Sequence, residues 1–547
     1  LDRVDAVARH VSTSFYGNLV AVSESPLREG LLYAGTDDGR IQMTADAGTS
    51  WRPVEPYHDV PRWAAVSDLE ASLHDEATVY AAFDNHKNSD FKPYLFRSSD
   101  RGKHWRSISG DLPDRGSVYA LAEDHLNRNL LFAGTEFGLF FTLDGGRHWI
   151  PLKGNLPVIA VRDLEIQRRE NDLVVATFGR GFYILDDYSP LRNLTEDVLE
   201  KSALLFPVRR TLAYIPRQRL GLPGKAFQGD SFFIAPNPPF GAVFTYYLRN
   251  PLQSLKKQRQ EKEKHLIKEG ADLSLPGWEE LRAEDREEDP VILLTVRDED
   301  GSVVRRLEGP TSAGFHRVAW DLRLPPYEPT SLKKTDDGGP FDQPPEGPMV
   351  MPGAYSVSLA SRVGGRLSQL GGSEKFDVVP LGLASFKAAD PSALLAFQKK
   401  TGRLQRAVLG TVKAAREVRD RIDHIKKALL DTPGAPPRLA VRVREIEEHL
   451  RDLQVELSGD STRTSRHAPT PPSIVDRVQR IISGHWSSTS APTRTHLRNY
   501  EIAAARFENL LTRFRILVES DLANLEDEME TAGAPWTPGR LPRWSPR

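Results

Sequence analysis

The sequence predicts a mainly β protein with an α-helical C-terminal domain, and three observations support this prediction. A strand-and-turn unit recurs within residues 1–190. Residues 191–385 are again rich in strand-forming segments, but they lack that repeat. Within residues 386–534 the apolar residues recur every three or four positions, as they do on helices, and residues 535–547 form a proline-containing tail.

The composition excludes several classes of function. The formal net charge is −2, so no broad attraction to nucleic acid is expected. No apolar stretch is long enough to predict a membrane span. The chain has no cysteine, which excludes disulfides, thiolate metal sites and cysteine catalysis. The sequence predicts neither a metal site nor a cofactor.

The repeat in residues 1–190 contains a turn with the pattern Ser/Thr-x-Asp-x-Gly-x-x-Trp, called an Asp box. The pattern occurs at Thr44–Trp51, Ser98–Trp105 and Thr142–Trp149. The three tryptophans lie 54 and 44 residues apart, spacings that suit one four-stranded β-propeller blade.

A second repeated segment consists of short strands rich in aliphatic and aromatic residues. Leu31–Thr36 matches Leu130–Thr135, and Leu173–Phe178 is a further copy that no Asp box follows. Turns rich in Gly and Asp separate the strands. We therefore expect a partial propeller of about four blades, which is too short to close unaided.

The chemistry of the Asp box indicates a structural role. Asp in a tight turn accepts hydrogen bonds from nearby backbone N–H groups, and Gly supplies a positive φ. Trp packs between neighbouring strands and buries a large apolar area. We assign this structural role, and no catalytic one, to Asp46, Gly48, Trp51, Asp100, Gly102, Trp105, Asp144, Gly146 and Trp149.

These Asp boxes, also called BNR repeats, resemble those in the propellers of sialidases, xyloglucanases and sortilin. The chain as a whole more closely resembles the C-terminal half of large bacterial exported proteins with sortilin-like or glycosyl-hydrolase-like repeats. Pro93–Phe96, Leu130–Gly138 and Ala176–Asp187 carry this closer resemblance. It implies a periplasmic or secreted protein in which a longer propeller region precedes Leu1, where neither a methionine nor an apolar signal segment is found.

The turns opposite the Asp boxes are where the resemblance places propeller ligands. The Asp box joins the third and fourth strands of a blade, so the turn between the second and third strands lies on the opposite face. These turns carry the expected ligand-binding residues Asp37, Asp38, His86, Lys92, Phe137 and Arg180.

Three carboxylates in the same turns are weak candidates for catalysis: Asp84, Asp90 and Glu136. Glycoside hydrolysis uses two carboxyl groups roughly 5–9.5 Å apart, of which one is kept protonated. The alternative is that these carboxylates are turn residues that bond to the local backbone.

Residues 191–385 have the pattern of a β-sandwich, similar to immunoglobulin-like or fibronectin-III-like modules. Strands are expected at Val243–Leu248, Val291–Val296, Val303–Leu307, Gly314–Arg323 and Pro352–Leu359. The turn Asp298–Gly301 favours a type I′ hairpin, and Trp320 and Tyr355 are expected in the core. Residues 253–288 are dense in Lys, Arg and Glu, which predicts an exposed helical insertion.

Residues 386–534 predict an antiparallel helical bundle. Apolar stripes run from Leu404 to Leu429 and from Leu439 to Leu457. A short helix is expected at Ile474–Ile482 and a long one at Thr493–Glu530. Loops that contain proline separate these helices, as in antiparallel bundles.

No complete catalytic motif occurs in the 547 residues, so the first hypothesis is a binding or scaffolding protein for a protein or glycan ligand. The alternative is a sialidase- or xyloglucanase-like glycoside hydrolase whose active site requires blades missing from this chain. A third hypothesis is a subunit of a larger extracytoplasmic assembly, with the missing blades supplied in trans. A deep cleft that holds a protonated carboxyl group would favour the hydrolase, whereas scattered exposed carboxylates would favour binding.

Overall fold

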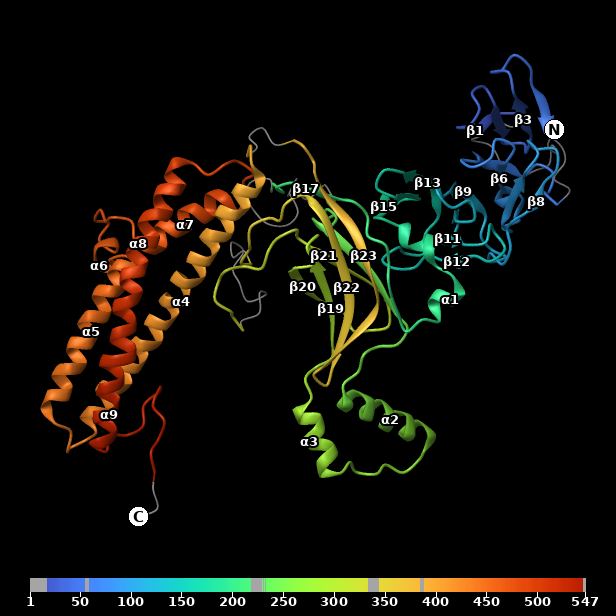
Figure 1. The fold of residues 1–547 in the computed structure, drawn as a ribbon. Helices are drawn as coiled ribbons and strands as arrows, with labels where there is room; N and C mark the ends of the chain where they lie inside the picture. Colours follow the sequence, from blue (N-terminus) through green and yellow to red (C-terminus); the bar gives the residue numbers. More distant parts are fainter. Residues whose placement is uncertain are drawn as a thin grey trace. The chain divides into compact units, whose positions relative to one another are not determined.

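The structure is a computed structural model that describes residues 17–54, 59–217, 229, 231, 233–332, 344–383 and 388–544 (Figure 1). It divides into two compact units, Leu1–Phe206 and Pro207–Arg547. The predicted boundary at 385/386 falls outside the described residues. The boundaries at 190/191 and 534/535 stay predictions.

The first unit contains four consecutive antiparallel sheets, called blades 1 to 4 here, in which the strand order follows the chain. Blade 1 holds β1 (Leu19–Glu24), β2 (Leu32–Thr36), β3 (Ile41–Thr44) and β4 (Arg52–Val54). Blade 2 holds β5 (Ala65–Ala71), β6 (Val79–Asp84), β7 (Tyr94–Ser98) and β8 (Arg106–Ser107), with the 3-10 helix η1 (His86–Asn88) between β6 and β7.

Blade 3 holds β9 (Val118–Glu123), β10 (Leu131–Thr135), β11 (Gly138–Thr142) and β12 (Ile150–Pro151). Blade 4 has three strands, β13 (Val161–Gln167), β14 (Asp172–Thr177) and β15 (Phe182–Leu185). The short elements η2 (Ser189–Asn193), α1 (Glu196–Leu199) and β16 (Ala203–Leu205) follow. The missing fourth strand of blade 4 agrees with the absence of an Asp box after this copy of the repeat.

The core of the first unit lies between successive blades. The first strand of each blade is called its inner strand here, and the inner strands of blades 2, 3 and 4 pack on the blade before them. A Cβ atom built on Gly35 of β2 would lie 2.5 Å from Val66 Cγ1 and 3.2 Å from Leu69 Cδ1 of β5. Gly134 of β10 meets Val161 of β13 in the same way, at 2.7 Å. Glycine at this position therefore lets the next blade approach closely.

The second unit begins with two β-sheets that pack face to face. One has the order β17-β23-β22-β19-β20, formed by β17 (Thr211–Ala213), β23 (Arg366–Pro380), β22 (Gly353–Val363), β19 (Val291–Arg297) and β20 (Val303–Gly309). In the other, β18 (Ala242–Leu248) pairs antiparallel with β21 (Gly314–Trp320).

Aromatic side chains join the two sheets. The Trp320 ring of β21 lies 5.6 Å from the Tyr355 ring of β22, and the Phe244 ring of β18 lies 5.6 Å from the Phe376 ring of β23. Trp320 is fully buried and Tyr355 is 8% exposed, which confirms that both are core residues. The closer likeness to immunoglobulin or fibronectin modules stays a prediction.

The hairpin between β19 and β20 differs from the predicted type I′ turn. Gly301 N donates to Asp298 O at 3.0 Å, and Gly301 has a φ of 77°, whereas Glu299 and Asp300 keep negative φ. A register shift follows at Arg297. This is a type I turn closed by a glycine bulge, because the Asp-Gly pair supplies its positive φ only at the second residue.

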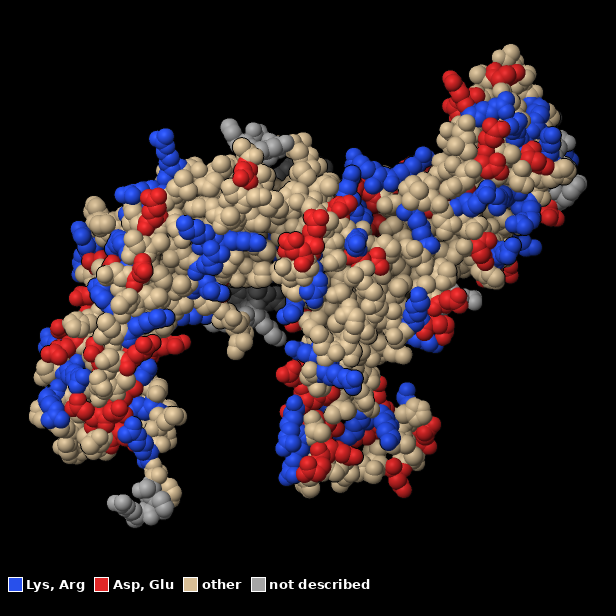
Figure 2. Space-filling model, viewed as in Figure 1, with Lys and Arg blue, Asp and Glu red and all other residues tan. Residues whose placement is uncertain are grey.

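The charged segment 253–288 forms two exposed helices, α2 (Leu255–Glu269) and α3 (Trp278–Arg286), as predicted. Neither helix has a buried residue. Lys and Arg side chains are interspersed with Asp and Glu over this arm (Figure 2). Arg259 of α2 pairs with Glu284 of α3 at 2.6 Å, so the two helices are held together by charge rather than by an apolar core.

The C-terminal region is helical, with α4 (Pro391–Leu430), α5 (Pro437–Ser458), α6 (Ser461–Thr464), α7 (Ile474–His485), α8 (Arg494–Ile516), the π-helical turn η5 (Leu517–Leu522) and α9 (Ala523–Thr531). Its apolar stripes meet in one core cluster, which includes Val408, Ile446, Val478 and Phe507. Among the described residues, no helix combines the length and the apolar character that a membrane crossing requires.

Candidate functional site

The four turns between the second and third strands lie at one end of the blades. In blade 1, Asp37 accepts hydrogen bonds from Gly17 N (2.9 Å) and Asn18 Nδ2 (2.7 Å). Asp38 accepts one from the Thr36 hydroxyl. Asp37 therefore fixes the residues just before β1, whereas Asp38 binds a side chain of its own turn.

The longer loop of blade 2 holds two separate groups of polar side chains. Asp84 pairs with the half-exposed imidazole of His86. Asp90 instead accepts hydrogen bonds from Asn85 Nδ2 (2.9 Å) and the Tyr94 hydroxyl (2.7 Å). Burial alone raises the pKa of Asp90, but these hydrogen bonds outweigh it and hold the pKa below its usual value. Asp90 is thus an anion rather than a general acid.

Three of the remaining predicted residues occupy the same loop or the neighbouring turns. Lys92 is exposed, and its backbone N–H donates to Asp90 Oδ1 at 3.3 Å. Phe137 is 55% exposed at the tip of the turn in blade 3. Arg180 is exposed in the turn of blade 4.

Tyr119 of β9 connects the turns of blades 2, 3 and 4. Its hydroxyl donates to Glu136 Oε2 at 2.5 Å, and the Arg162 guanidinium lies 3.7 Å from the centre of its ring. Burial raises the pKa of Tyr119, as do the Glu136 hydrogen bond and the charge of Asp84. Arg162 also lies over the Phe178 ring at 5.5 Å. We call this group, Asp84, His86, Tyr119, Glu136, Arg162 and Phe178, the mouth cluster.

The sequence analysis assigned no role to Tyr119, Arg162 or Phe178 in a site. Tyr119 and Arg162 each follow the first residue of an inner strand, at a β-bulge that turns the side chain toward the mouth. The equivalent bulge positions in blades 1 and 2 are held by Val20 and Ser67. Aligning the four inner strands at the bulge could have identified Tyr119 and Arg162 from the sequence.

A second group of carboxyl groups, also missed from the sequence, lies along β5. Asp68 Oδ2 accepts a hydrogen bond from Leu121 N of β9 at 2.7 Å. Burial raises the pKa of Asp68 to about 6. Burial, followed by the charges of Asp68 and Glu123, raises the pKa of Glu70 to about 8. Glu70 is therefore a carboxyl group that holds its proton at neutral pH.

The Asp boxes lie at the other end of the blades. Asp144 Oδ1 accepts hydrogen bonds from Arg147 N (2.9 Å), His148 N (3.1 Å) and Thr142 Oγ1 (2.8 Å), and Asp100 forms the equivalent set. Asp46 Oδ1 accepts two such bonds, from Ser50 N (2.9 Å) and Thr44 Oγ1 (2.7 Å). Gly48, Gly102 and Gly146 all have positive φ. Trp149 is 5% exposed and Trp105 is partly buried, but Trp51 is 46% exposed. Each box thus closes its own turn, whereas the burial of its tryptophan differs between blades.

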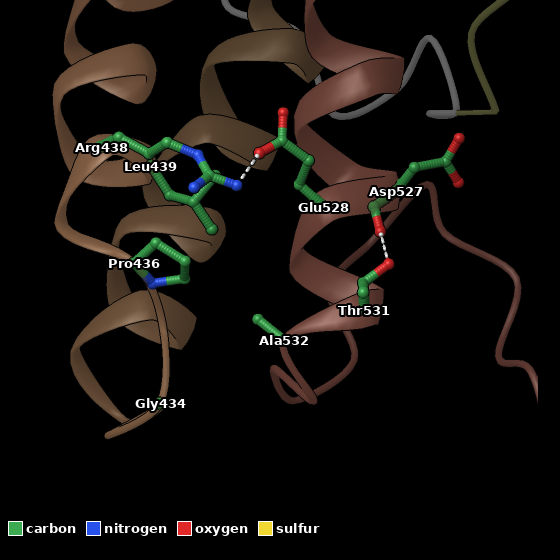
Figure 3. A pocket seen from close by; sticks show the side chains of 8 residues that line it. All are labelled: Gly434, Pro436, Arg438, Leu439, Asp527, Glu528, Thr531 and Ala532. Atoms are coloured by element: carbon green, nitrogen blue, oxygen red, sulfur yellow. Dashed lines mark hydrogen bonds and ion pairs between the residues drawn. The ribbon is translucent and has the colours of Figure 1, made fainter.

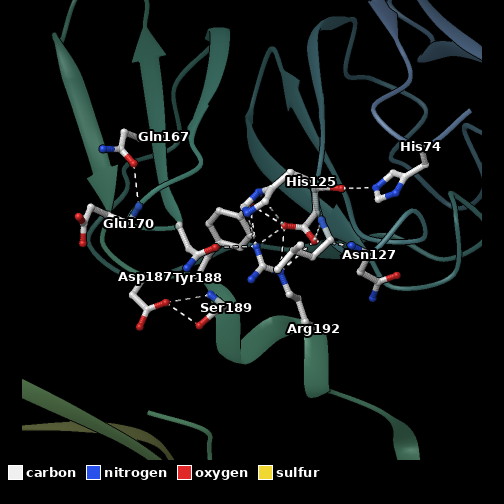
Figure 4. A network of polar contacts seen from close by, with 12 residues as sticks. His74, His125, Asn127, Gln167, Glu170, Asp187, Tyr188, Ser189 and Arg192 are labelled. Carbon is white, nitrogen blue, oxygen red and sulfur yellow. Dashed lines mark hydrogen bonds and ion pairs between the residues drawn. The ribbon is translucent and has the colours of Figure 1, made fainter. Parts of the chain in front are cut away.

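A buried ion pair lies at the Asp-box end of blade 3 (Figure 4). Asp124 is fully buried and accepts hydrogen bonds from Arg192 Nη2 and from the Tyr188 hydroxyl, both at 2.6 Å. His74 Nε2 lies 2.7 Å from the Asp124 carbonyl oxygen. The network ties η2, which follows blade 4, to blade 3, and its burial gives it a structural role.

The second unit holds the cavity shown in Figure 3, within its helical region. It has a volume of about 370 Å³ and is lined by the loop before α5, the first turn of α5 and the end of α9, including Arg438, Leu439, Glu528 and Thr531. Among the described residues, no group of His, Asp and Glu side chains is arranged to hold a metal ion.

Comparison with known proteins gives one local sequence similarity. No family model matches the chain. The chain is 31% identical over 124 residues to a xyloglucanase of Hypocrea jecorina, which covers 21% of this chain and 15% of that protein. It therefore spans much less than two thirds of its curated relative.

Solved structures with some likeness to the chain include β-propeller domains. They include the GH74 xyloglucanase of Xanthomonas campestris (16% identity, 29% of this chain and 26% of that chain, TM-score 0.25). They also include YCF48 of Cyanidioschyzon merolae (16% identity, 30% of this chain and 52% of that chain, TM-score 0.23). Likenesses at these TM-scores do not bear on what this chain does.

Proposed function

We propose that the chain is an extracytoplasmic β-propeller protein, periplasmic or secreted, that binds or scaffolds a protein or glycan ligand at the mouth cluster. Further blades complete this propeller, either in the same natural chain or in trans. The arrangement of Tyr119, Arg162 and Phe178 is the observation that carries the proposal.

This arrangement offers a ligand both a flat surface and hydrogen bonds. The exposed Arg162 guanidinium lies against the Tyr119 ring, and Phe178 beside it is 69% exposed. Stacked guanidinium and aromatic planes suit sugar rings or peptide groups. Asp84 and Glu136 add acceptors at the edge, so the site combines apolar area with a few directed polar groups, as binding sites do.

Glycan- and peptide-array screens, followed by calorimetry on any ligand found, test this proposal. Arg162→Ala and Phe178→Ala should each weaken binding by about tenfold or more, equivalent to ~1.4 kcal/mol. Arg147→Ala is the matched control, since Arg147 is exposed in an Asp box at the other end of the blades. Equal effects of the Arg162 and Arg147 changes would contradict a ligand site at the mouth.

A glycoside hydrolase is the second candidate, and the pKa of Glu70 favours it. A carboxyl group that stays protonated at neutral pH can act as a general acid, with a neighbouring carboxylate as its partner. The local similarity to a xyloglucanase points in the same direction. Release of reducing sugar from xyloglucan, with loss of activity in Glu70→Gln, would support the hydrolase. Activity unchanged by that substitution would exclude Glu70 as the acid.

A further inference from the structure

The end of α7 joins the helical region of the second unit to the loops of its β-sandwich. His485, the last residue of α7, accepts a hydrogen bond on its carbonyl oxygen from Gln398 Nε2 of α4 at 3.1 Å. The next residue, Trp486, accepts one on its carbonyl oxygen from Arg323 Nη1 at 3.1 Å, and its indole N–H donates to Glu346 O at 2.9 Å. Arg323 follows β21 and Glu346 precedes β22. We call these five residues the seam.

The sandwich side of the seam is buried and well bonded. Arg323 is 7% exposed, donates to Gly347 O at 2.9 Å and pairs with Glu346 at 3.0 Å. Tyr327, four residues further along, packs on α4, since a Cβ built on Gly402 would lie 2.2 Å from its ring. The positive charge of Arg323 thus has a carboxylate as its partner, and the seam is a fixed contact.

His485 brings a titratable side chain into this contact. The side chain is 1% exposed, and its Nδ1 has no hydrogen-bond partner. Its ring lies 4.6 Å from the ring of His496 on α8 and 5.5 Å from that of Phe397 on α4. His496 Nδ1 is also buried and without a partner. Within the part of the chain that the structure describes, neither imidazole contacts a carboxylate, so a proton on either ring gains no counter-ion.

The other charged groups around the pair face other partners. Lys400 of α4 lies over a tyrosine ring of α8 at 4.4 Å, and Arg323 and Glu346 pair with each other. Burial, followed by the charge of His496, lowers the pKa of His485 to about 4, and burial lowers the pKa of His496 as well. The closed seam therefore keeps both histidines neutral, whereas an open seam lets them take up protons.

We infer that the seam is an acid-sensitive joint, in which protons on His485 and His496 free the end of α7 from the sandwich loops while the rest of the helical core stays packed. The joint is fully closed above the ordinary histidine pKa of 6.5, and its stability is lost as the pH falls toward 4. If His485 regains its ordinary pKa on opening, the open fraction should rise about 30-fold between pH 7.5 and pH 5. The inference does not depend on the ligand proposed for the mouth cluster, which lies in the first unit.

Hydrogen exchange of the full chain, followed by mass spectrometry, measures this opening. After correction for the intrinsic effect of pH on exchange, the amides of residues 480–488 and 321–327 should exchange about 30-fold faster at pH 5 than at pH 7.5. The corrected rates in α5 should be equal at the two pH values. Equal corrected rates in the seam, or an increase that extends through α5, would overturn the inference.

Three variants test which groups titrate. His485→Phe keeps an aromatic ring but cannot take a proton, so the seam should stay protected at pH 5. His496→Phe removes the second charge and should reduce the increase, which keeps the proposal testable if His485→Phe does not fold. His424→Phe is the control, because His424 is exposed on α4 with Nδ1 2.7 Å from Asp420 O, and it should respond to acid as the parent does. The full increase in His485→Phe or in His496→Phe, or its loss in the control, would refute the proposal.

Discussion

Replacing Arg192 by alanine should destabilise the first unit by removing the partner of a buried charge. Asp124 is fully buried, and Arg192 donates to it through Nε (2.9 Å to Oδ2) and Nη2 (2.6 Å to Oδ1). The Tyr188 hydroxyl and two backbone N–H groups donate to the same carboxylate. These neutral donors remain in the variant, but the positive charge is lost.

The expected cost is about 3–5 kcal/mol, which is the usual penalty for leaving a buried charge without its partner. For a unit of this size, that loss should lower the midpoint of thermal unfolding by roughly 6–20 °C at neutral pH. Burial alone raises the pKa of Asp124, but the hydrogen bonds from Arg192 and Tyr188 outweigh it and hold the pKa below its usual value. The advantage of the unaltered chain is therefore present above about pH 4 and is lost as the pH falls through the lowered pKa.

Scanning calorimetry of both proteins between pH 7 and pH 3 measures this difference. Arg169→Ala is the control, because Arg169 forms a 3.0 Å pair with Glu170 while remaining 78% exposed. Exposed pairs contribute about 0–1 kcal/mol. If Arg192→Ala costs no more than this control at pH 7, or if its cost does not fall in acid, the ion pair does not hold η2 to blade 3 as argued.

Three further predictions concern single residues. Gly146→Ala should lower the free energy of unfolding in urea by about 2–5 kcal/mol, because the φ of 95° is left-handed and Ile108 Cβ would lie 2.7 Å from the new methyl group. Gly372→Ala is the control: the space around Gly372 is open, so the free energy of unfolding should fall by less than about 0.5 kcal/mol. The folded chain binds the Glu70 proton more tightly than the unfolded chain, so the free energy of unfolding of the unaltered chain should fall as the pH rises from 4.5 to about 8. Glu70→Gln should reduce this fall. An equal dependence of the free energy of unfolding on pH in both proteins would show that the carboxyl group ionises freely. Burial alone raises the pKa of Asp144, but the hydrogen bonds of the Asp box outweigh it and lower the pKa to about 2. The Asp144 carboxylate therefore adds stability above pH 3.8 that is lost as the pH falls toward 2, and Asp144→Asn should remove it. Equal midpoints of acid unfolding in the two proteins would contradict this.

Local chemistry made much of the fold predictable from the sequence. An Asp box and the strands before it are set by residues close together in the chain, so the repeat predicted the short strands and turns of the first unit. In the second unit, the strand expected at Gly314–Arg323 and the apolar stripe from Leu404 to Leu429 likewise predicted β21 and α4. The prediction of a type I′ turn at Asp298–Gly301 was wrong because the sequence could not show that Gly301 would take its positive φ as the bulge residue after the turn and not at one of the two central positions.

The mouth cluster was less predictable because it depends on contacts between blades. Asp84 and Glu136 were named from their turns, but the residue between them, Tyr119, belongs to an inner strand and reaches the mouth only through a β-bulge. Arg162 comes from the next blade along the chain. Neighbours of this kind become visible only when the blades are placed side by side.

The repeat also shows how an exposed apolar residue can be interpreted. Isolated exposed apolar side chains are ordinary in soluble proteins and call for no explanation. Leu19 and Val22 differ, because the residues at their register positions in the next three blades are all buried by a neighbouring blade. The same comparison separates Trp51 from Trp149, although both stand in the same eight-residue pattern. Within a repeat, the exposed fraction of a residue can thus be compared with that of the equivalent residues in the other blades. Where apolar residues of the first and last blades are much more exposed than their equivalents, a contact is missing and the surface is not simply a free one.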